Sequence, residues 1–202
     1  MKLRSNPKFS DVTLKIDGKL IQAHKCLLAS RSGKFKMMFE ANMIEENQGM
    51  ITIETQKPTL MMSIIDWIYS SEIDFPDNTT DMFELILMAD EYLLDDLRRK
   101  VEDGLIFRLD QDNALEILVV ASKYPSITSE NLIEMAITTL IEDFDNILRK
   151  FPDAEDQLKS VPGLITKILL FIHHRKTKSK RVAFLSRDSS REEKNESFLS
   201  NS

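Results

Sequence analysis

The chain has 202 residues, which is enough for one domain or for one domain with a small appendage. Its formal net charge of −6 argues against a protein that binds phosphate backbones, because such proteins are normally basic. The single cysteine excludes an internal disulfide and fits a reducing compartment, so we expect the protein in the cytoplasm, the nucleus or both. The first residues lack the apolar segment of a signal peptide, and no apolar run is long enough to span a bilayer.

The chain begins with a pattern of short strands. Residues 1–8 are polar and are expected to be flexible. Apolar residues then alternate over residues 11–16, which is typical of a half-buried strand. Asp17-Gly18 predicts a tight hairpin turn that returns the chain as a second strand over residues 19–23. A third short strand is predicted over residues 50–54.

Between the second and third strands, residues 23–39 predict two short helices that meet at Gly33. Leu27 and Leu28 lie on the first of these helices. Phe35 and Phe39 lie four residues apart on the second and therefore share one face. We expect the rest of the chain to pack on this helical elbow, and its outer apolar surface to contact another protein chain.

Helical patterns dominate the sequence after the third strand. Pro58 opens one helix, and residues 81–89 form a helix that is apolar on most sides. A further helix is predicted over residues 90–105, with its inward side formed by Tyr92, Leu93, Leu94, Leu97 and Val101.

A charged break over residues 108–112 separates this part from a second helical section. Helices are predicted over residues 113–124, 129–144, 147–151 and 164–173, the first of them capped by Asp110 or Asp112. From residue 174 the sequence is rich in Lys, Arg, Ser and Glu, and we expect a disordered tail over residues 174–202.

Several strings together resemble the BTB/POZ domain, and they occur in the order and spacing of that family: Phe9-Ser10-Asp11-Val12-Thr13-Leu14, Ala23-His24-Lys25, Leu27-Leu28-Ala29-Ser30-Arg31-Ser32, Trp67-Ile68-Tyr69-Ser70-Ser71-Glu72-Ile73 and Leu87-Met88-Ala89-Asp90-Glu91-Tyr92-Leu93. The resemblance implies an α+β fold, in which a small mixed sheet of short strands is combined with a cluster of helices. It places the BTB domain at residues 9–107. Residues 108–173 resemble part of the all-α BACK, or 3-box, extension that follows many BTB domains.

The resemblance implies a homodimer, or a dimer with another BTB protein, formed through the first helix and its neighbours. The matching interface residues are Leu27, Leu28, Arg31 and Phe39. A charged pocket at the dimer seam is matched by Asp11 and Lys25. The alternative is that these residues serve packing and turns in a monomer, and at least one of Leu27 and Leu28 must face the core.

The resemblance also implies docking on cullin-3. Adaptors for this ubiquitin-ligase scaffold carry a hydrophobic residue, any residue and then glutamate between the second helix and the third strand, and Met43-Ile44-Glu45 matches that pattern. Tyr69 and Tyr92 would border the same groove, although a core role is the alternative for both. An ordinary loop with Met43 anchored in the core is the alternative for the triplet.

No pattern indicates an enzyme. The sequence has no Gly-rich phosphate loop, and its three histidines and one cysteine lack metal-ligand spacing, so we expect no catalytic residues, metal or cofactor. Cys26 is expected to be buried among leucines and inert. The basic run over residues 175–181 is read as part of a solvated tail, with a nuclear-localisation or nucleic-acid segment as the alternative. Neither a membrane nor a nucleic acid is expected as a partner.

Two functions remain open from the sequence. The first is a homodimeric adaptor that brings an unidentified substrate protein to a cullin-3 ubiquitin ligase. The alternative is a BTB oligomerisation scaffold, transcriptional or cytoskeletal, that does not dock on the ligase. No MATH-like or kelch-like substrate module is recognisable within the 202 residues.

Overall fold

The computed structural model describes residues 8–41 and 49–177. The chain divides into two compact units, Met1–Phe144 and Asp145–Ser202. The predicted α+β class with a small mixed sheet and a helical extension is confirmed.

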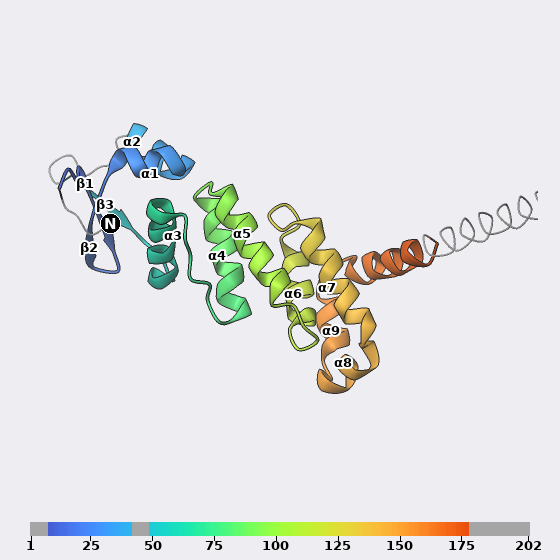
Figure 1. Cartoon of the computed structure of the whole chain (residues 1–202). Helices are drawn as coiled ribbons and strands as arrows, with labels where there is room; N and C mark the ends of the chain where they lie inside the picture. Colours follow the sequence, from blue (N-terminus) through green and yellow to red (C-terminus); the bar gives the residue numbers. More distant parts are fainter. Residues whose placement is uncertain (1–7, 42–48, 178–202) are drawn as a thin grey trace, which may run out of the picture. The chain divides into compact units, whose positions relative to one another are not determined.

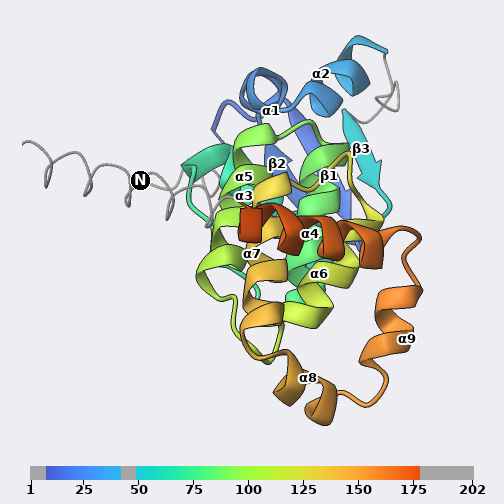
Figure 2. The ribbon, with the colours of Figure 1, turned by 90° about the vertical axis from the view of Figure 1, so that its right-hand side faces the viewer.

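The first unit contains a three-stranded sheet. Its strands are β1 (Val12–Ile16), β2 (Lys19–Ala23) and β3 (Met50–Ile53), in the spatial order β2-β1-β3 (Figure 2). β1 pairs antiparallel with β2 and parallel with β3, so that Leu14 lies opposite Ile21 on one side and Ile51 on the other. The predicted hairpin turn is confirmed, because Asp17 and Gly18 both adopt positive φ, at 49° and 74°. The apolar residues of β1 are buried, as their alternation predicts.

The helices of this unit are α1 (Lys25–Arg31), α2 (Gly33–Glu40), α3 (Pro58–Ser70), α4 (Thr79–Glu91), α5 (Asp95–Phe107), α6 (Ala114–Lys123) and α7 (Glu130–Glu142). α3 contacts both α1 and α4, and α4 pairs with α5 (Figure 1). α6 and α7 pair with each other, and they contact α4 and α5 respectively. Side chains cap the N-termini of three of these helices: Ser32 caps α2, Asn78 caps α4 and Ser129 caps α7. The result is a layered stack that runs from the sheet to the α6–α7 pair.

The structure corrects the predicted helix over residues 90–105. α4 ends at Glu91, and α5 begins only at Asp95. Leu93 between them has a positive φ of 55° and is 55% exposed, so the prediction that it faces inward is wrong. A helical pattern does not reveal this break, because the residues on either side of it, Tyr92 and Leu94, are buried as the helix model requires.

The second unit contains α8 (Phe144–Lys150) apart from its first residue, α9 (Ala154–Lys159) and a helix over residues 164–177. The sequence predicts α8 and the last helix but not α9, and it ends the last helix at residue 173 rather than 177. The remaining residues of the predicted tail, 178–202, lie outside the described residues. None of the helices in the described ranges has the length and apolarity that crossing a membrane requires.

Candidate protein-interaction surface

The elbow between α1 and α2 is built around a buried serine. Ser32 is fully buried, and its Oγ accepts a hydrogen bond from the Phe35 N–H at 3.3 Å, which caps the N-terminus of α2. The same Oγ donates to the Tyr92 carbonyl oxygen at 2.7 Å. One hydroxyl therefore both starts α2 and ties the elbow to the turn between α4 and α5.

Gly33 allows the elbow to approach that turn closely. A Cβ added at Gly33 would lie 2.7 Å from Leu93 Cδ1 and 3.2 Å from Leu93 Cβ, both closer than normal contact. The sequence predicts that the two helices meet at Gly33, and the structure supplies the reason for a glycine at this point. The elbow and the α4–α5 turn consequently form one surface.

An aromatic cluster lies beneath this surface. The Phe35 ring is fully buried, with its centroid 5.2 Å from that of Tyr92 and 6.1 Å from that of Phe39. Lys34 places its Nζ 4.3 Å from the Tyr92 ring centroid and pairs with Glu91. Burial raises the pKa of the Tyr92 hydroxyl to about 12, so this phenol is neutral at physiological pH. Tyr92 is thus a core residue that supports the surface from below.

The residues of α1 divide between core and surface. Leu28 is fully buried and Leu27 is half-buried, which confirms that at least one of the two faces the core. Leu28 has no exposed area in the single chain, so we expect it to support the predicted dimer surface from within. Cys26 is exposed, so the expectation of a buried thiol is wrong.

Arg31, at the end of α1, is exposed but held in place. Its Nη1 donates to Ser71 Oγ at 2.7 Å, and its guanidinium lies 5.8 Å from the centroid of the Trp67 ring. Ser71 directly follows α3, in a left-handed conformation. These contacts join the end of α1 to the end of α3 and fix the position of the Arg31 charge at the surface.

Two further contacts hold the start of α1. Asp11 Oδ1 accepts a hydrogen bond from the Lys25 N–H at 2.8 Å, which places a carboxylate at the positive end of the helix. The Tyr69 hydroxyl accepts a hydrogen bond from the His24 N–H at 2.9 Å and lies 3.0 Å from His24 Nδ1. The two residues predicted for a charged pocket are therefore in contact, through the backbone of Lys25 and the side chain of Asp11.

Exposed apolar side chains lie on the outer side of the elbow. Met37 is 54% exposed and lies one turn after Gly33, on the same side of α2. Leu93, which contacts Gly33 at the base of that side, is 55% exposed. Sequence reasoning did not select either residue for a partner site, because the positive φ that turns Leu93 outward leaves no trace in an apolar pattern.

The triplet Met43-Ile44-Glu45 lies outside the described residues. The chain enters that segment after α2, which ends at Glu40, and leaves it before β3, which begins at Met50. Met37 is on the last turn of α2, close to the point where the segment begins, whereas Leu93 contacts Gly33 at the other end of α2. Over the two ranges that the structure covers, no group of three or more His, Cys, Asp or Glu residues is placed to hold a metal ion.

The family model for the BTB/POZ domain matches residues 1–109. The chain belongs to the BTB/POZ family. BTB domains are protein-interaction modules that associate with themselves or with other BTB proteins, and the match points to no enzyme family.

Two curated relatives share parts of this BTB protein. TD and POZ domain-containing protein 4 of Mus musculus is 32% identical over 139 residues, which are 69% of this chain and 37% of the relative. Protein maternal effect lethal 26 of Caenorhabditis elegans is 29% identical over 169 residues, which are 83% of this chain and 41% of the relative. The chain therefore spans less than half the length of either relative.

Solved BTB domains also match. The BTB domain of human gigaxonin is 26% identical, with a TM-score of 0.43, and the match covers 50% of this chain and 80% of that one. The BTB domain of zebrafish PATZ1 is 24% identical, with a TM-score of 0.41, over 48% of this chain and 75% of that one.

A buried charge joins the last helix of the matched BTB region to the helices that follow it. Glu102 on α5 is 3% exposed, and its Oε1 accepts hydrogen bonds from Arg98 Nη1 at 3.3 Å and from the Ser129 N–H at 3.2 Å. Arg98 Nη1 also donates to the Ile127 carbonyl oxygen at 2.7 Å. This network holds the start of α7 against α5, in agreement with the contact between the two helices. The α6–α7 pair is thereby fixed to the BTB domain.

Proposed function

We propose that this BTB protein is an adaptor that docks on cullin-3 and presents a substrate protein to the ubiquitin ligase. The observation that carries the proposal is the position of Met43-Ile44-Glu45, between α2 and β3 of a BTB domain. Cullin-3 adaptors of the family resemble this chain in having a hydrophobic residue and a glutamate at that point. A methionine there suits insertion into a partner pocket, because its flexible stem adapts to the pocket shape.

The exposed patch of Met37 and Leu93 supports the proposal. Binding energy at protein interfaces is concentrated in a few central side chains that become desolvated together. Met37 would extend the apolar area that Met43 offers, since it lies one turn before the end of α2, and Leu93 would continue that area toward the start of α2 at Gly33. Tyr69 and Tyr92 would contribute indirectly, by fixing the backbone next to this surface. The Tyr69 hydroxyl accepts a hydrogen bond from the His24 N–H, and the Tyr92 carbonyl oxygen in the α4–α5 turn accepts one from Ser32.

Calorimetric titration of the N-terminal region of cullin-3 with the full chain tests the docking surface. We expect at least about tenfold weaker binding for the double variant Met43→Ala/Glu45→Ala and for Leu93→Asp. Phe107→Ser is the matched control, because Phe107 is 91% exposed at the opposite end of α5, roughly 20 Å from Leu93 at 1.5 Å per residue. Wild-type affinity in both test variants would argue against this surface.

We further propose that the dimer forms through α1 and α2, with Leu27, Arg31 and Phe39 on its surface and Asp11 and Lys25 at its rim. A two-fold interface uses the same patch on both chains, so the half-buried Leu27 of one chain would pack near Leu27 of the other. Leu27→Asp tests this seam while leaving the buried Leu28 in place.

Light scattering should show a folded monomer for Leu27→Asp and a dimer for the wild type. Replacing Leu28 as well would also disrupt the core, so the double variant should lose the dimer, the fold or both. An unchanged dimer in Leu27→Asp would place the seam elsewhere. A dimer that binds no cullin-3 at micromolar concentration would favour the alternative function, an oligomerisation scaffold without ligase docking.

A further inference from the structure

The last described helix, residues 164–177, has one buried side and one exposed apolar side. Leu164 is 2% exposed and Ile168 is 9% exposed, so these two residues form the buried side of the helix. Ile165, Leu169 and Leu170 are instead 40%, 61% and 54% exposed. Ile165 and Leu169 lie four residues apart on one side of the helix, and Leu170 widens the apolar area next to them.

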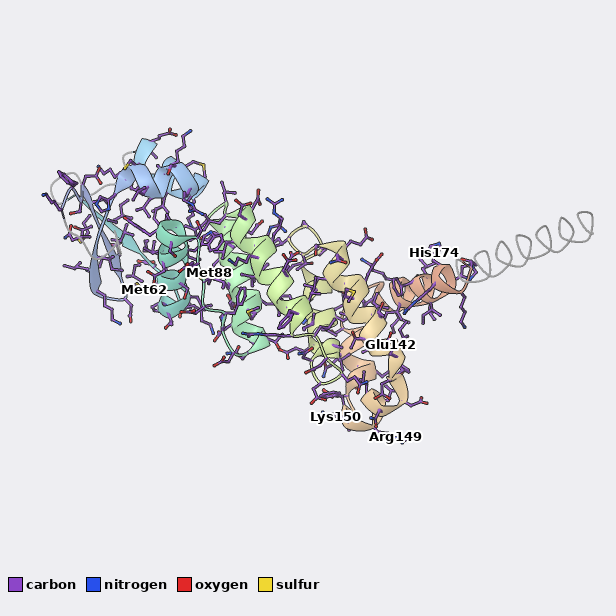
Figure 3. The ribbon with its side chains drawn as sticks, viewed as in Figure 1. Met62, Met88, Glu142, Arg149, Lys150 and His174 are labelled. Carbon is purple, nitrogen blue, oxygen red and sulfur yellow. The ribbon has the colours of Figure 1, made fainter. Side chains whose placement is uncertain are left out.

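The same segment is strongly basic, although the whole chain has a net charge of −6. No Asp or Glu occurs from Gln157 to Arg187, and the basic residues of that stretch are Lys159, Lys167, Arg175, Lys176, Lys178, Lys180, Arg181 and Arg187. The exposed C-terminal end of the helix carries Arg175 and Lys176 next to His174, which Figure 3 labels. Exposed aliphatic side chains are thus followed, within two helical turns, by positive charge.

We propose that this helix binds the surface of a membrane that contains anionic phospholipids. Ile165, Leu169 and Leu170 would enter the boundary between headgroups and acyl chains, while Lys176, which is seven residues after Leu169 on the same side of the helix, contacts the anionic headgroups. The helix lies on the membrane and does not cross it. This inference does not depend on cullin-3 docking, and it differs from the expectation from sequence that no membrane is a partner.

The structure favours a flat anionic surface over other occupants. A groove that surrounds the helix would require Leu164 and Ile168 to leave their buried positions. A second copy of the same segment would bring like charges together, which opposes association. Nucleic acid would be contacted through polar and basic side chains at its phosphates, and that contact would leave the aliphatic side chains in water.

Co-sedimentation of the full chain with lipid vesicles tests the proposal. We expect the wild type to sediment with phosphatidylcholine vesicles that contain phosphatidylserine and to remain in solution with vesicles of phosphatidylcholine alone. Leu169→Asp/Leu170→Asp and Arg175→Glu/Lys176→Glu should each reduce the apparent affinity by about tenfold or more. Raising the salt concentration should also weaken the binding. Met135→Asp is the matched control, because Met135 is a 40% exposed apolar residue on α7, in the first unit.

Three results of the vesicle experiment would contradict the proposal. Absence of sedimentation with phosphatidylserine vesicles, equal sedimentation with neutral vesicles, or full binding by Leu169→Asp/Leu170→Asp would each contradict it. Binding to duplex DNA or to polyglutamate without binding to the anionic vesicles would assign the basic segment to an acidic macromolecule instead. Circular dichroism of each variant confirms that the helices remain folded, since every substituted residue is exposed.

Discussion

Replacing Ser32 by alanine should destabilise the protein far more than removal of one hydroxyl from a surface would. The substitution removes the side-chain cap of α2, which is worth about 1 kcal/mol. It also removes the 2.7 Å hydrogen bond to the Tyr92 carbonyl oxygen, and an unsatisfied buried acceptor costs about 1–3 kcal/mol. We therefore expect the free energy of unfolding to fall by about 2–4 kcal/mol.

Equilibrium unfolding in urea measures this change, followed by the fluorescence of the single tryptophan, Trp67, which is 5% exposed. Protein concentration is held constant, because dimerisation contributes to apparent stability. Ser30→Ala is the matched control: Ser30 is exposed on α1, and we expect a change within about 0.5 kcal/mol. A Ser32→Ala midpoint as close to the wild type as that of the control would refute the proposed role of the elbow hydroxyl.

Three other substitutions address the same region and the extension. Gly33→Ala should lower the free energy of unfolding by about 1–3 kcal/mol in the same assay, because its Cβ would lie 2.7 Å from Leu93 Cδ1. Glu102→Ala should cost about 2–3 kcal/mol in thermal unfolding, since it removes the buried carboxylate that pairs with Arg98, whose side chain is only 22% exposed, and that accepts the Ser129 N–H; an unchanged melting temperature would contradict this. The pKa of Tyr92 is raised from 10.0 to about 12, so its contribution to stability is complete below pH 10 and is lost as the pH rises toward 12. Between pH values below 10 and near 12, the free energy of unfolding should therefore fall by about 2–3 kcal/mol less in Tyr92→Phe than in the wild type. Urea midpoints measured at both ends of this pH range give the comparison.

The sequence predicts the regular parts of this fold well, because their signals are local. The alternation over β1 and the Asp17-Gly18 turn act within a few residues, and Pro58 is found at the start of α3, as predicted. The meeting of two helices at Gly33 also follows from the sequence. Each of these features depends on the conformational preference of the residue itself.

Features that depend on distant contacts were not predictable in the same way. The choice between Leu27 and Leu28 for the core is made by the helices packed on α1, and the same applies to the exposure of Cys26. Leu93 faces solvent because the backbone turns between α4 and α5, at a place where Ser32 holds the Tyr92 carbonyl. The exposure of Leu93 beside the elbow therefore emerges only from the structure.

The central claim is that the surface around the elbow meets other polypeptide chains. Sedimentation velocity of the full chain, alone and mixed with the N-terminal region of cullin-3, tests it most directly. We predict that the protein alone sediments as a dimer of its 23.3 kDa chain and moves to a heavier species when cullin-3 is added. A single species of 23.3 kDa that cullin-3 does not shift would contradict the account.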